Sequence, residues 1–432
     1  MKINAPILSA LIALLLLPFV LHAQSMKKPQ VIVWGSTIEA FASAVQSARS
    51  NVPTLWVSPG NDFMPELQGK AIAQLEASYS LDGGVWMDLL MAIAGSEVRS
   101  DSTAQQIKSR LNVRLLINAM EEVVRNEENL ELITGLELAE VKVARKGLRV
   151  QISNNKSYTV RSLVDASFDQ SVNRFFNKDA KDIDASRIFK APSDLSLQEL
   201  RTIVINGEFN QKHQVVVFKD LLSQIDDRVI GFPGLYMQDR IDFSELPFRF
   251  AYGQTVGATA AYCAFFKAKS EDIKLRKLQE ELILYKTRLS PFEDIASENK
   301  LFTSLQYFSL AGVFQGKVVD NRYILDHERL VLVEEVEDVF KSFSPRSRIW
   351  FETHKEIPSE LTWENFLSLI KFISFKGKEI HQEIEDSWSS KFGFEGEFNP
   401  EGSVNRYEFA VVTQLYFKPF SVAVDHHGQI VQ

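Results

Sequence analysis

The chain has 432 residues, which is too long for one ordinary domain and suits two or three. Its 48 basic and 56 acidic side chains give a net charge of −8, and this acidic balance excludes nucleic acid as the main partner. The single cysteine, Cys263, excludes an intramolecular disulfide and a multi-cysteine metal site, and the seven histidines are scattered along the chain. We therefore expect no metal site, and we attribute any chemistry to a bound organic cofactor.

The first 23 residues have the pattern of a secretory signal peptide. Lys2 precedes an apolar run at 10–17, and the small residue Ala23 ends the segment. The alternative is a membrane anchor, but a spanning helix needs roughly 20 apolar residues, and Pro18 interrupts this run. The pattern predicts cleavage after Ala23 and a secreted, periplasmic or cell-surface protein with no transmembrane span in the mature chain.

A strand–helix–strand unit is predicted next. The apolar runs 31–34 and 54–57 are typical of parallel strands buried on both faces, and apolar residues spaced by three and four between them indicate a helix from Ile38. The turn after the first strand of such a unit presents unpaired helix amides, which can bind the pyrophosphate of a dinucleotide.

That turn carries part of a dinucleotide-binding fingerprint. The fingerprint requires three small residues, and the sequence offers Gly35, Thr37 and Ala40. The acidic residue expected at the end of the second strand is replaced by Ser58, which cannot act as a charged bidentate acceptor. These residues alone fit either a dinucleotide-binding turn or the turn of another parallel α/β protein.

Two later segments favour the dinucleotide interpretation. Alternating runs within 131–167 predict a β-meander and a final strand with Asp165 and Ala166 at its C-terminal end. The Gly- and Ala-rich segment 250–262 predicts a helix start whose small side chains would let the helix N-terminus approach a flat ring.

The chain here resembles the secreted FAD-dependent oxidoreductases of the glutathione-reductase-like superfamily. The resemblance rests on segments 31–40, 134–141, 163–169 and 252–261, in the expected order. The last two, LVDASFD and YGQTVGATAA, are similar to that family's IDATYEGD and GQAAGTAAA segments. The resemblance implies an α/β fold with a Rossmann-like, FAD-binding domain at 28–268.

The resemblance also implies an FAD site. Its members would be Gly35, Ser36, Thr37 and Ala40 at the pyrophosphate, Ser58 near the ribose, Leu138 at the adenine, Asp165 and Ala166 beside the dinucleotide, and Gly253, Gln254 and Gly257 presenting a helix N-terminus to the flavin. The family's substrate domain would be short or missing here, around 168–220. No side chain stands out as a catalytic acid or base, so the catalytic residues and the small-molecule substrate stay unknown.

The remaining chain predicts a helical linker at 269–295 and an α-helical, repeat-like region at 296–432. Leu330, Phe366 and Phe409 each lie in a short apolar helix start, with spacings of 36 and 43 residues.

These units resemble S-layer homology modules. Segment 303–316 looks like a first helix with its glycine cap, and 404–410 looks like the module's TRAEFA helix start. The resemblance implies that Arg406 would bind an anionic cell-envelope glycan, with His327 and Trp363 at the matching places of the other units. The alternative is a helical bundle that only packs against the first domain.

Two functions therefore compete. The first is a secreted FAD-dependent oxidoreductase that transfers a hydride or electrons from a small organic substrate. The second is a non-catalytic relic of the same fold that serves as a cell-envelope binding or scaffolding protein. An open groove between the Gly35 turn and the Gly253 helix would favour the enzyme, whereas Trp34 or Phe250 filling that space would favour the relic.

Overall fold

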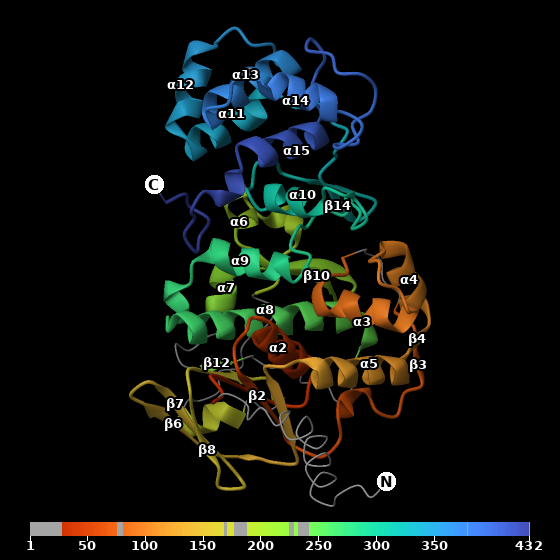
Figure 1. The fold of residues 1–432 in the computed structure, drawn as a ribbon, viewed down its shortest axis with the longest axis vertical. Helices are drawn as coiled ribbons and strands as arrows, with labels where there is room; N and C mark the ends of the chain where they lie inside the picture. Colours follow the sequence, from red (N-terminus) through yellow and green to blue (C-terminus); the bar gives the residue numbers. More distant parts are fainter. Residues whose placement is uncertain are drawn as a thin grey trace, which may run out of the picture.

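A computed structural model describes residues 28–75, 81–167, 171–176, 188–223, 229–231, 242–377 and 379–431. It contains a larger α/β body and a smaller helical body, stacked along the long axis of the molecule (Figure 1). The predicted signal peptide, 1–23, lies outside the described residues. Within the described ranges, none of the helices combines the length and the apolar character that a membrane span requires.

The α/β body is built on a parallel sheet, which confirms the predicted mixed α/β class. Its five described strands lie in the order β12, β9, β1, β2, β5, and each pairs in parallel with its neighbours. They are β1 (Val31–Trp34), β2 (Thr54–Ser58), β5 (Leu130–Thr134), β9 (Ser162–Asp165) and β12 (Val229–Gly231).

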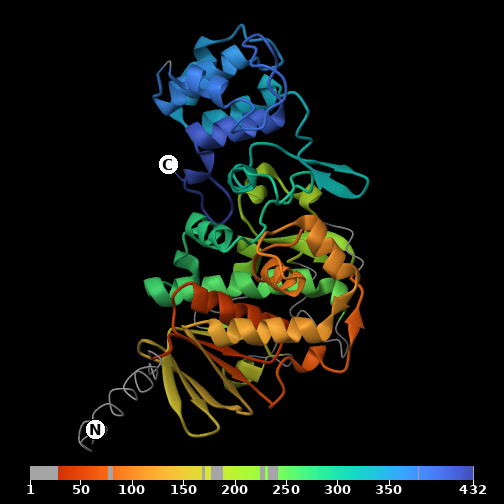
Figure 2. The ribbon, with the colours of Figure 1, turned by 45° about the vertical axis from the view of Figure 1, so that its right-hand side comes forward.

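Three layers form this body, because the central strands are buried on both faces. Val31 and Val33 of β1 pack with the helical side, which includes α2 (Ile38–Arg49) and α8 (Leu246–Phe266). Ile32 and Trp34 pack on the other face against an antiparallel meander. The meander consists of β6 (Leu138–Ala144), β7 (Gly147–Ile152) and β8 (Ser157–Val160). Figure 2 shows the order meander, sheet, α2 and α8 from a second angle.

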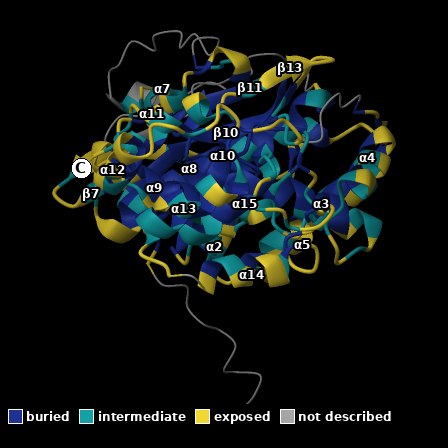
Figure 3. Cartoon of the chain, turned by 90° about the horizontal axis from the view of Figure 1, so that it is seen from above, coloured by how far each residue is buried: buried dark blue, intermediate teal, exposed yellow. Residues whose placement is uncertain are grey.

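Further elements surround α8. An antiparallel hairpin packs against it and lies with it in the buried centre of the molecule (Figure 3). The hairpin is β10 (Ile203–Phe209) and β11 (Lys212–Val217), within the segment where a short substrate insert was expected. The other strands and α-helices of this body are β3 (Ile72–Ala73), α3 (Gly84–Ala94), α4 (Asp101–Ser109), β4 (Leu111–Asn112), α5 (Val113–Asn126), α6 (Leu197–Leu200), α7 (Phe218–Leu222) and α9 (Leu275–Leu284). Its short 3-10 helices include η1 (Pro65–Leu67) and η5 (Phe243–Glu245).

The helical body is organised around a closed ring of backbone hydrogen bonds. The amide of Val331 donates to the carbonyl of Val404, that of Val404 donates to Leu361, and that of Leu361 donates to Val331, each at 2.9 Å. One helix begins just after each of these residues: α11 (Val333–Phe343), α13 (Trp363–Ser374) and α15 (Arg406–Tyr416). The other elements are α10 (Phe302–Ser309), β13 (Lys317–Val319), β14 (Arg322–Ile324), α12 (Pro345–Thr353) and α14 (Glu379–Ser387).

The ring corrects the predicted register of the first unit. The amides of Val333, Trp363 and Arg406 occupy matching places, because each donates at 2.9 Å to a carbonyl of the neighbouring segment. Val333, rather than His327, therefore corresponds to Trp363 and Arg406. By the same register Val336, rather than Leu330, corresponds to Phe366 and Phe409. The chain turns at Asp326, where φ is +61°, before the helix begins.

Candidate functional site

The turn after β1 closes tightly against the end of β9. Gly35 has a φ of +133°, a conformation that side-chain-bearing residues rarely adopt. A methyl group at Gly35 would lie 2.3 Å from the carbonyl oxygen of Ala166. The glycine therefore allows two distant segments, both predicted as cofactor-binding, to lie side by side.

Thr37 joins the same two segments and starts α2. Its hydroxyl accepts a hydrogen bond from the Ala40 amide at 3.2 Å and donates one to the Ala166 carbonyl at 3.1 Å. Ser36 is half-buried between Gly35 and Thr37. The structure thus brings the predicted pyrophosphate residues together with Ala166, at a capped helix N-terminus.

A carboxylate that the sequence analysis missed occupies this helix N-terminus. The amide of Ile38, the first residue of α2, donates to Glu66 Oε1 at 2.5 Å. Arg249 of α8 donates to Glu66 Oε2 at 2.9 Å. Arg249 also binds both carboxylate oxygens of Glu39, at 2.6 and 2.8 Å. The Glu66 side chain is only 7% exposed, so one guanidinium and one helix terminus hold it inside the protein.

The charges of this cluster do not balance. Burial raises the pKa of Glu66 to about 7, against the attraction of Arg249 and with the repulsion of Glu39. Burial and the nearby Asp242 likewise raise the pKa of Glu245, at the end of η5, to about 7. Three carboxyl groups therefore surround one guanidinium, and burial shifts the protonation of two of them toward neutral pH.

Helix α8 packs directly on α2, and the position of its start corrects a prediction. The helix begins at Leu246, so Gly253 lies about two turns inside it rather than at its N-terminus. A methyl group at Gly253 would lie 2.7 Å from the Glu39 carbonyl oxygen, and one at Gly257 would lie 2.3 Å from that of Ser43. These glycines set the distance between two helices.

Gln254 connects three helices. Its Oε1 accepts a hydrogen bond from the Val85 amide in the first turn of α3 at 3.1 Å. Its Nε2 donates to Gln46 Oε1 on α2 at 2.7 Å. The side chain thus satisfies one amide at the N-terminus of α3 and holds α2, α3 and α8 in register.

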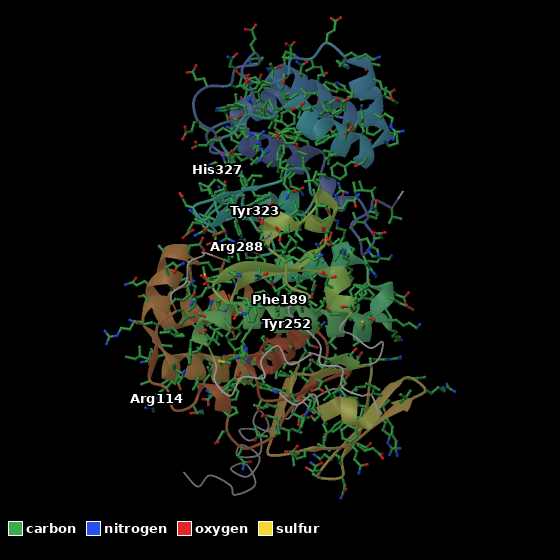
Figure 4. The ribbon with its side chains drawn as sticks, turned by 180° about the vertical axis from the view of Figure 1, so that it is seen from behind. Arg114, Phe189, Tyr252, Arg288, Tyr323 and His327 are labelled. Carbon is green, nitrogen blue, oxygen red and sulfur yellow. The ribbon has the colours of Figure 1, made fainter. Side chains whose placement is uncertain are left out.

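Aromatic rings fill the space between these helices. Phe250 is buried, with its ring centroid 5.2 Å from that of Trp86 and 5.9 Å from that of Phe41. Tyr252 of the same helix also lies in the interior of the α/β body (Figure 4), where burial raises the pKa of its hydroxyl. Trp34 packs on the opposite face of the sheet instead, in the core beneath the meander.

The remaining predicted residues lie outside this cluster of contacts. Ser58 ends β2, and its carbonyl accepts a hydrogen bond from the Gly135 amide at 3.1 Å. Leu138 pairs with Ile152 in the meander. Asp165 ends β9, where its carboxylate accepts hydrogen bonds from the amides of Ser167 and Val172, both at 3.1 Å.

The helix start does not fit a dinucleotide pyrophosphate in this arrangement. A phosphate bound there would need the first amides of α2, but Glu66 holds the Ile38 amide and Thr37 holds the Ala40 amide. A phosphate bound there would also lie against the carboxyl group of Glu66, and the ionised carboxylate would repel it.

Side chains outside the predicted site also differ from expectation. His213 is buried on β11 between Glu293, at 3.1 Å, and Asn206, at 2.7 Å. Arg406, the predicted glycan contact, is buried, and its guanidinium donates to the carbonyls of Gln315 and Leu325 and to Glu335 Oε1. No sequence signal marked Glu66, because it is a single acid in a segment without periodicity.

Neither a protein-family model nor a curated protein sequence matches the chain. Similar solved structures include the bacillithiol disulfide reductase of Staphylococcus aureus, 19% identical over 33% of this chain and 39% of that chain, with a TM-score of 0.24. The thioredoxin reductase of T. acidophilum is 12% identical over 32% of this chain and 34% of its own, with a TM-score of 0.22.

A third similar structure, OTEMO in complex with FAD and NADP, is 12% identical over 33% of this chain and 26% of its own, with a TM-score of 0.21. The chain therefore spans well under half the length of these neighbours. TM-scores this low do not establish a common fold for the whole chain, so the α/β class rests on the strand order and packing described above.

Proposed function

We propose that this chain is a cofactor-free, non-catalytic relic of a flavoprotein-like fold that serves as a binding or scaffolding protein of the cell envelope. The observation that carries the proposal is the filled interior between α2, α3 and α8. Phe250 of α8 stacks on Trp86 of α3 and packs edge-on against Phe41 of α2, so these rings fill space beside α8 that an open groove would require. The envelope location rests on the predicted signal peptide.

The architecture supports a scaffolding role. Guanidinium groups of the α/β body donate hydrogen bonds into the helical body: Arg201 to the Ala311 carbonyl at 3.0 Å, and Arg276 to the Leu310 carbonyl at 3.0 Å. The two bodies are thereby fixed relative to each other, and this rigidity suits a protein that presents surfaces to partners. The glycan contact at Arg406 is not part of the proposal, because that guanidinium is already bound within the helical body.

The second candidate is the FAD-dependent oxidoreductase. The observation in its favour is the arrangement of β1, α2 and β2 with a meander on the opposite face of the sheet, together with Asp165 paired to Trp34 and Ala166 beside the Gly35 turn. Its substrate would be a small organic molecule, and its catalytic residues are unassigned.

Bound flavin distinguishes the two candidates. We expect full-length protein, purified gently from cells grown with ample riboflavin, to release no flavin on denaturation and to show no absorbance near 450 nm. The matched measurement incubates the same protein with excess FAD before gel filtration. Flavin that co-elutes in one-to-one ratio, in either preparation, would contradict the relic and favour the oxidoreductase.

A further inference from the structure

Two elements far apart in sequence converge on the carboxyl group of Glu66. Oxygen Oε1 accepts from the first amide of α2, and Oε2 accepts from Arg249 on α8. A helix N-terminus and a guanidinium are both donors that favour an anion, and together they can bind the two oxygens of one anionic group. Glu66 itself is that group.

The surroundings indicate that this contact has a specific structural purpose. Glu39 already satisfies Arg249 through two hydrogen bonds, so Glu66 is not needed as its only counter-ion. Burying a further carboxyl group beside Glu39 is unfavourable, as the raised pKa of Glu66 shows. The compensating gain is the hydrogen bond that Glu66 accepts from the Ile38 amide, one of the amides that an α-helix leaves unpaired at its N-terminus.

We infer that Glu66 is an internal substitute for a bound phosphate group, which completes the N-terminus of α2 from within the chain. This inference rests on the proposed cofactor-free function and gives it a mechanism. The segment around η1 brings its own anion to the place where a dinucleotide would supply one. The folded chain then has its helix terminus and Arg249 paired without any ligand.

Removal of this carboxyl group should create an anion site that the natural chain lacks. In Glu66→Ala, the Ile38 amide loses its acceptor, Arg249 keeps Glu39 but loses one of its acceptors, and the truncated side chain leaves space beside them. Inorganic pyrophosphate is a suitable probe, because it offers several anionic oxygens to these donors. At pH 8 the probe is ionised, and the natural Glu66 competes with it as an anion.

The test compares thermal unfolding midpoints of the full chain in pyrophosphate and in sodium chloride of equal ionic strength. We expect Glu66→Ala to unfold several degrees below the natural protein in sodium chloride and to regain at least half of that loss in pyrophosphate. The natural protein should shift by no more than a degree between the two salts. Glu66→Gln should gain nothing from pyrophosphate, because its amide still fills the space.

Glu408→Ala is the matched control. Glu408 is also a buried carboxylate at a helix start, where it accepts from the Asn405 amide at 3.1 Å in the capping box of α15, but no arginine within the described ranges donates a hydrogen bond to it. We expect this variant to be destabilised and to gain nothing from pyrophosphate. An equal rise of the unfolding midpoint in pyrophosphate for both alanine variants would overturn the inference, since pyrophosphate would then stabilise any variant that has lost a buried carboxylate at a helix start.

Other outcomes separate this inference from the proposed function. If Glu66→Ala gains nothing from pyrophosphate while the natural protein holds no flavin, only the inference is wrong. If the natural protein holds flavin, the proposed function fails first. Should Glu66→Ala not fold in either salt, Glu66→Ser is measured in its place, because its small side chain leaves the same space.

Discussion

Glu245 makes the stability of the chain depend on pH. Its pKa is raised from 4.5 to about 7 because burial and Asp242 disfavour its charged form. A raised pKa means that folding stabilises the protonated form. The contribution is therefore complete below about pH 4.5 and is lost as the pH rises through about 7. Glu66 changes stability in the same direction.

We expect Glu245 to contribute a fall in the free energy of unfolding as the pH is raised from 4.5 to 8, and Glu245→Gln to remove this contribution. The neutral amide avoids burying a charge, so the variant should be more stable than the natural protein at pH 8. Urea unfolding at pH 5 and pH 8 measures the effect. Glu271→Gln, in which the replaced carboxylate is exposed, should unfold like the natural protein at both pH values. A steeper pH dependence in Glu245→Gln would contradict this account.

At the scale of single residues, the sequence predicted the turn at Gly35 and Thr37, but it did not predict that Glu66 binds the helix start beside that turn. Gly35 and Thr37 were identified because small and capping residues have local geometric roles, and these roles do not need the rest of the fold. Glu66 lies 28 residues from Ile38, and only the folded chain brings its carboxyl group to that amide. The pairing of Arg249 with Glu39, 210 residues away, cannot be read from the sequence for the same reason.

The contact between α2 and α8 depends on missing side chains. The backbone of Ser43 approaches Gly257 so closely that an added methyl group would lie 2.3 Å from the Ser43 carbonyl oxygen and 2.8 Å from its Cα. Because both neighbours are backbone atoms, the helices must separate to admit a larger residue. Ser43 also donates a hydrogen bond to the Gly253 carbonyl at 2.9 Å, which the separation would break.

We expect Gly257→Ala to lower the free energy of unfolding by about 1–3 kcal/mol, the usual cost of overpacking. Alanine favours the helix itself, so any loss comes from the helix–helix contact. Chemical denaturation measures it. Gly402→Ala is the control, because its added methyl group would lie 3.2 Å from the nearest backbone atom. A Gly257→Ala variant as stable as the natural protein would show that α2 and α8 can move apart freely.

At the scale of elements, apolar runs predicted β1 and β2 correctly because strands buried on both faces need continuous apolar residues. The start of α8 was placed too late, at the segment that contains Gly253. Glycine and alanine in that segment allow α8 to pack closely on α2, and a Gly- and Ala-rich segment of this kind can equally indicate a helix start. The first unit of the helical body was misplaced because the segment at 326–331 imitates the residue pattern of a helix start but contains a turn.

At the scale of the molecule, the C-terminal segment returns from the helical body to the α/β body. Phe420 packs with the core of the α/β body, and the Gly428 carbonyl accepts a hydrogen bond from Arg201 at 3.1 Å. His426 lies 2.9 Å from the Ile273 carbonyl oxygen. Arg288 and Tyr323 lie near the same junction (Figure 4). The segment 419–431 therefore acts as a strap between the two bodies.

We expect Gly428→Ala to loosen this strap without unfolding either body. The added methyl group would lie 1.9 Å from the Gln198 carbonyl oxygen. Limited proteolysis should cut the variant faster near 417–422, while its circular dichroism stays that of the natural protein. Gly393→Ala is the control, since Gly393 shares a positive φ (+68°, against +79°) but has open space around it. If both variants are cleaved equally fast, backbone strain at a positive φ explains the faster cleavage, and the contact of residue 428 with Gln198 does not.

The sequence predicted two bodies and their order, but it did not predict how they are joined. The strap and the arginines at the junction bind mainly backbone carbonyls, and a carbonyl acceptor has no sequence signature. The same limit applied to the ring at Val331, Leu361 and Val404, which consists of main-chain hydrogen bonds alone.

That ring also sets the order in which the chain can fold as it is synthesised. Two of its three hydrogen bonds involve Val404, which is made 404 − 361 = 43 residues after Leu361 and 404 − 331 = 73 residues after Val331. Until then α11 and α13 lack the partner that closes their aromatic faces, and exposed apolar surface of this kind favours aggregation. The helical body therefore stays incomplete until Val404 has been made, so we expect the nascent chain to need protection from aggregation between the synthesis of α11 and that of α15.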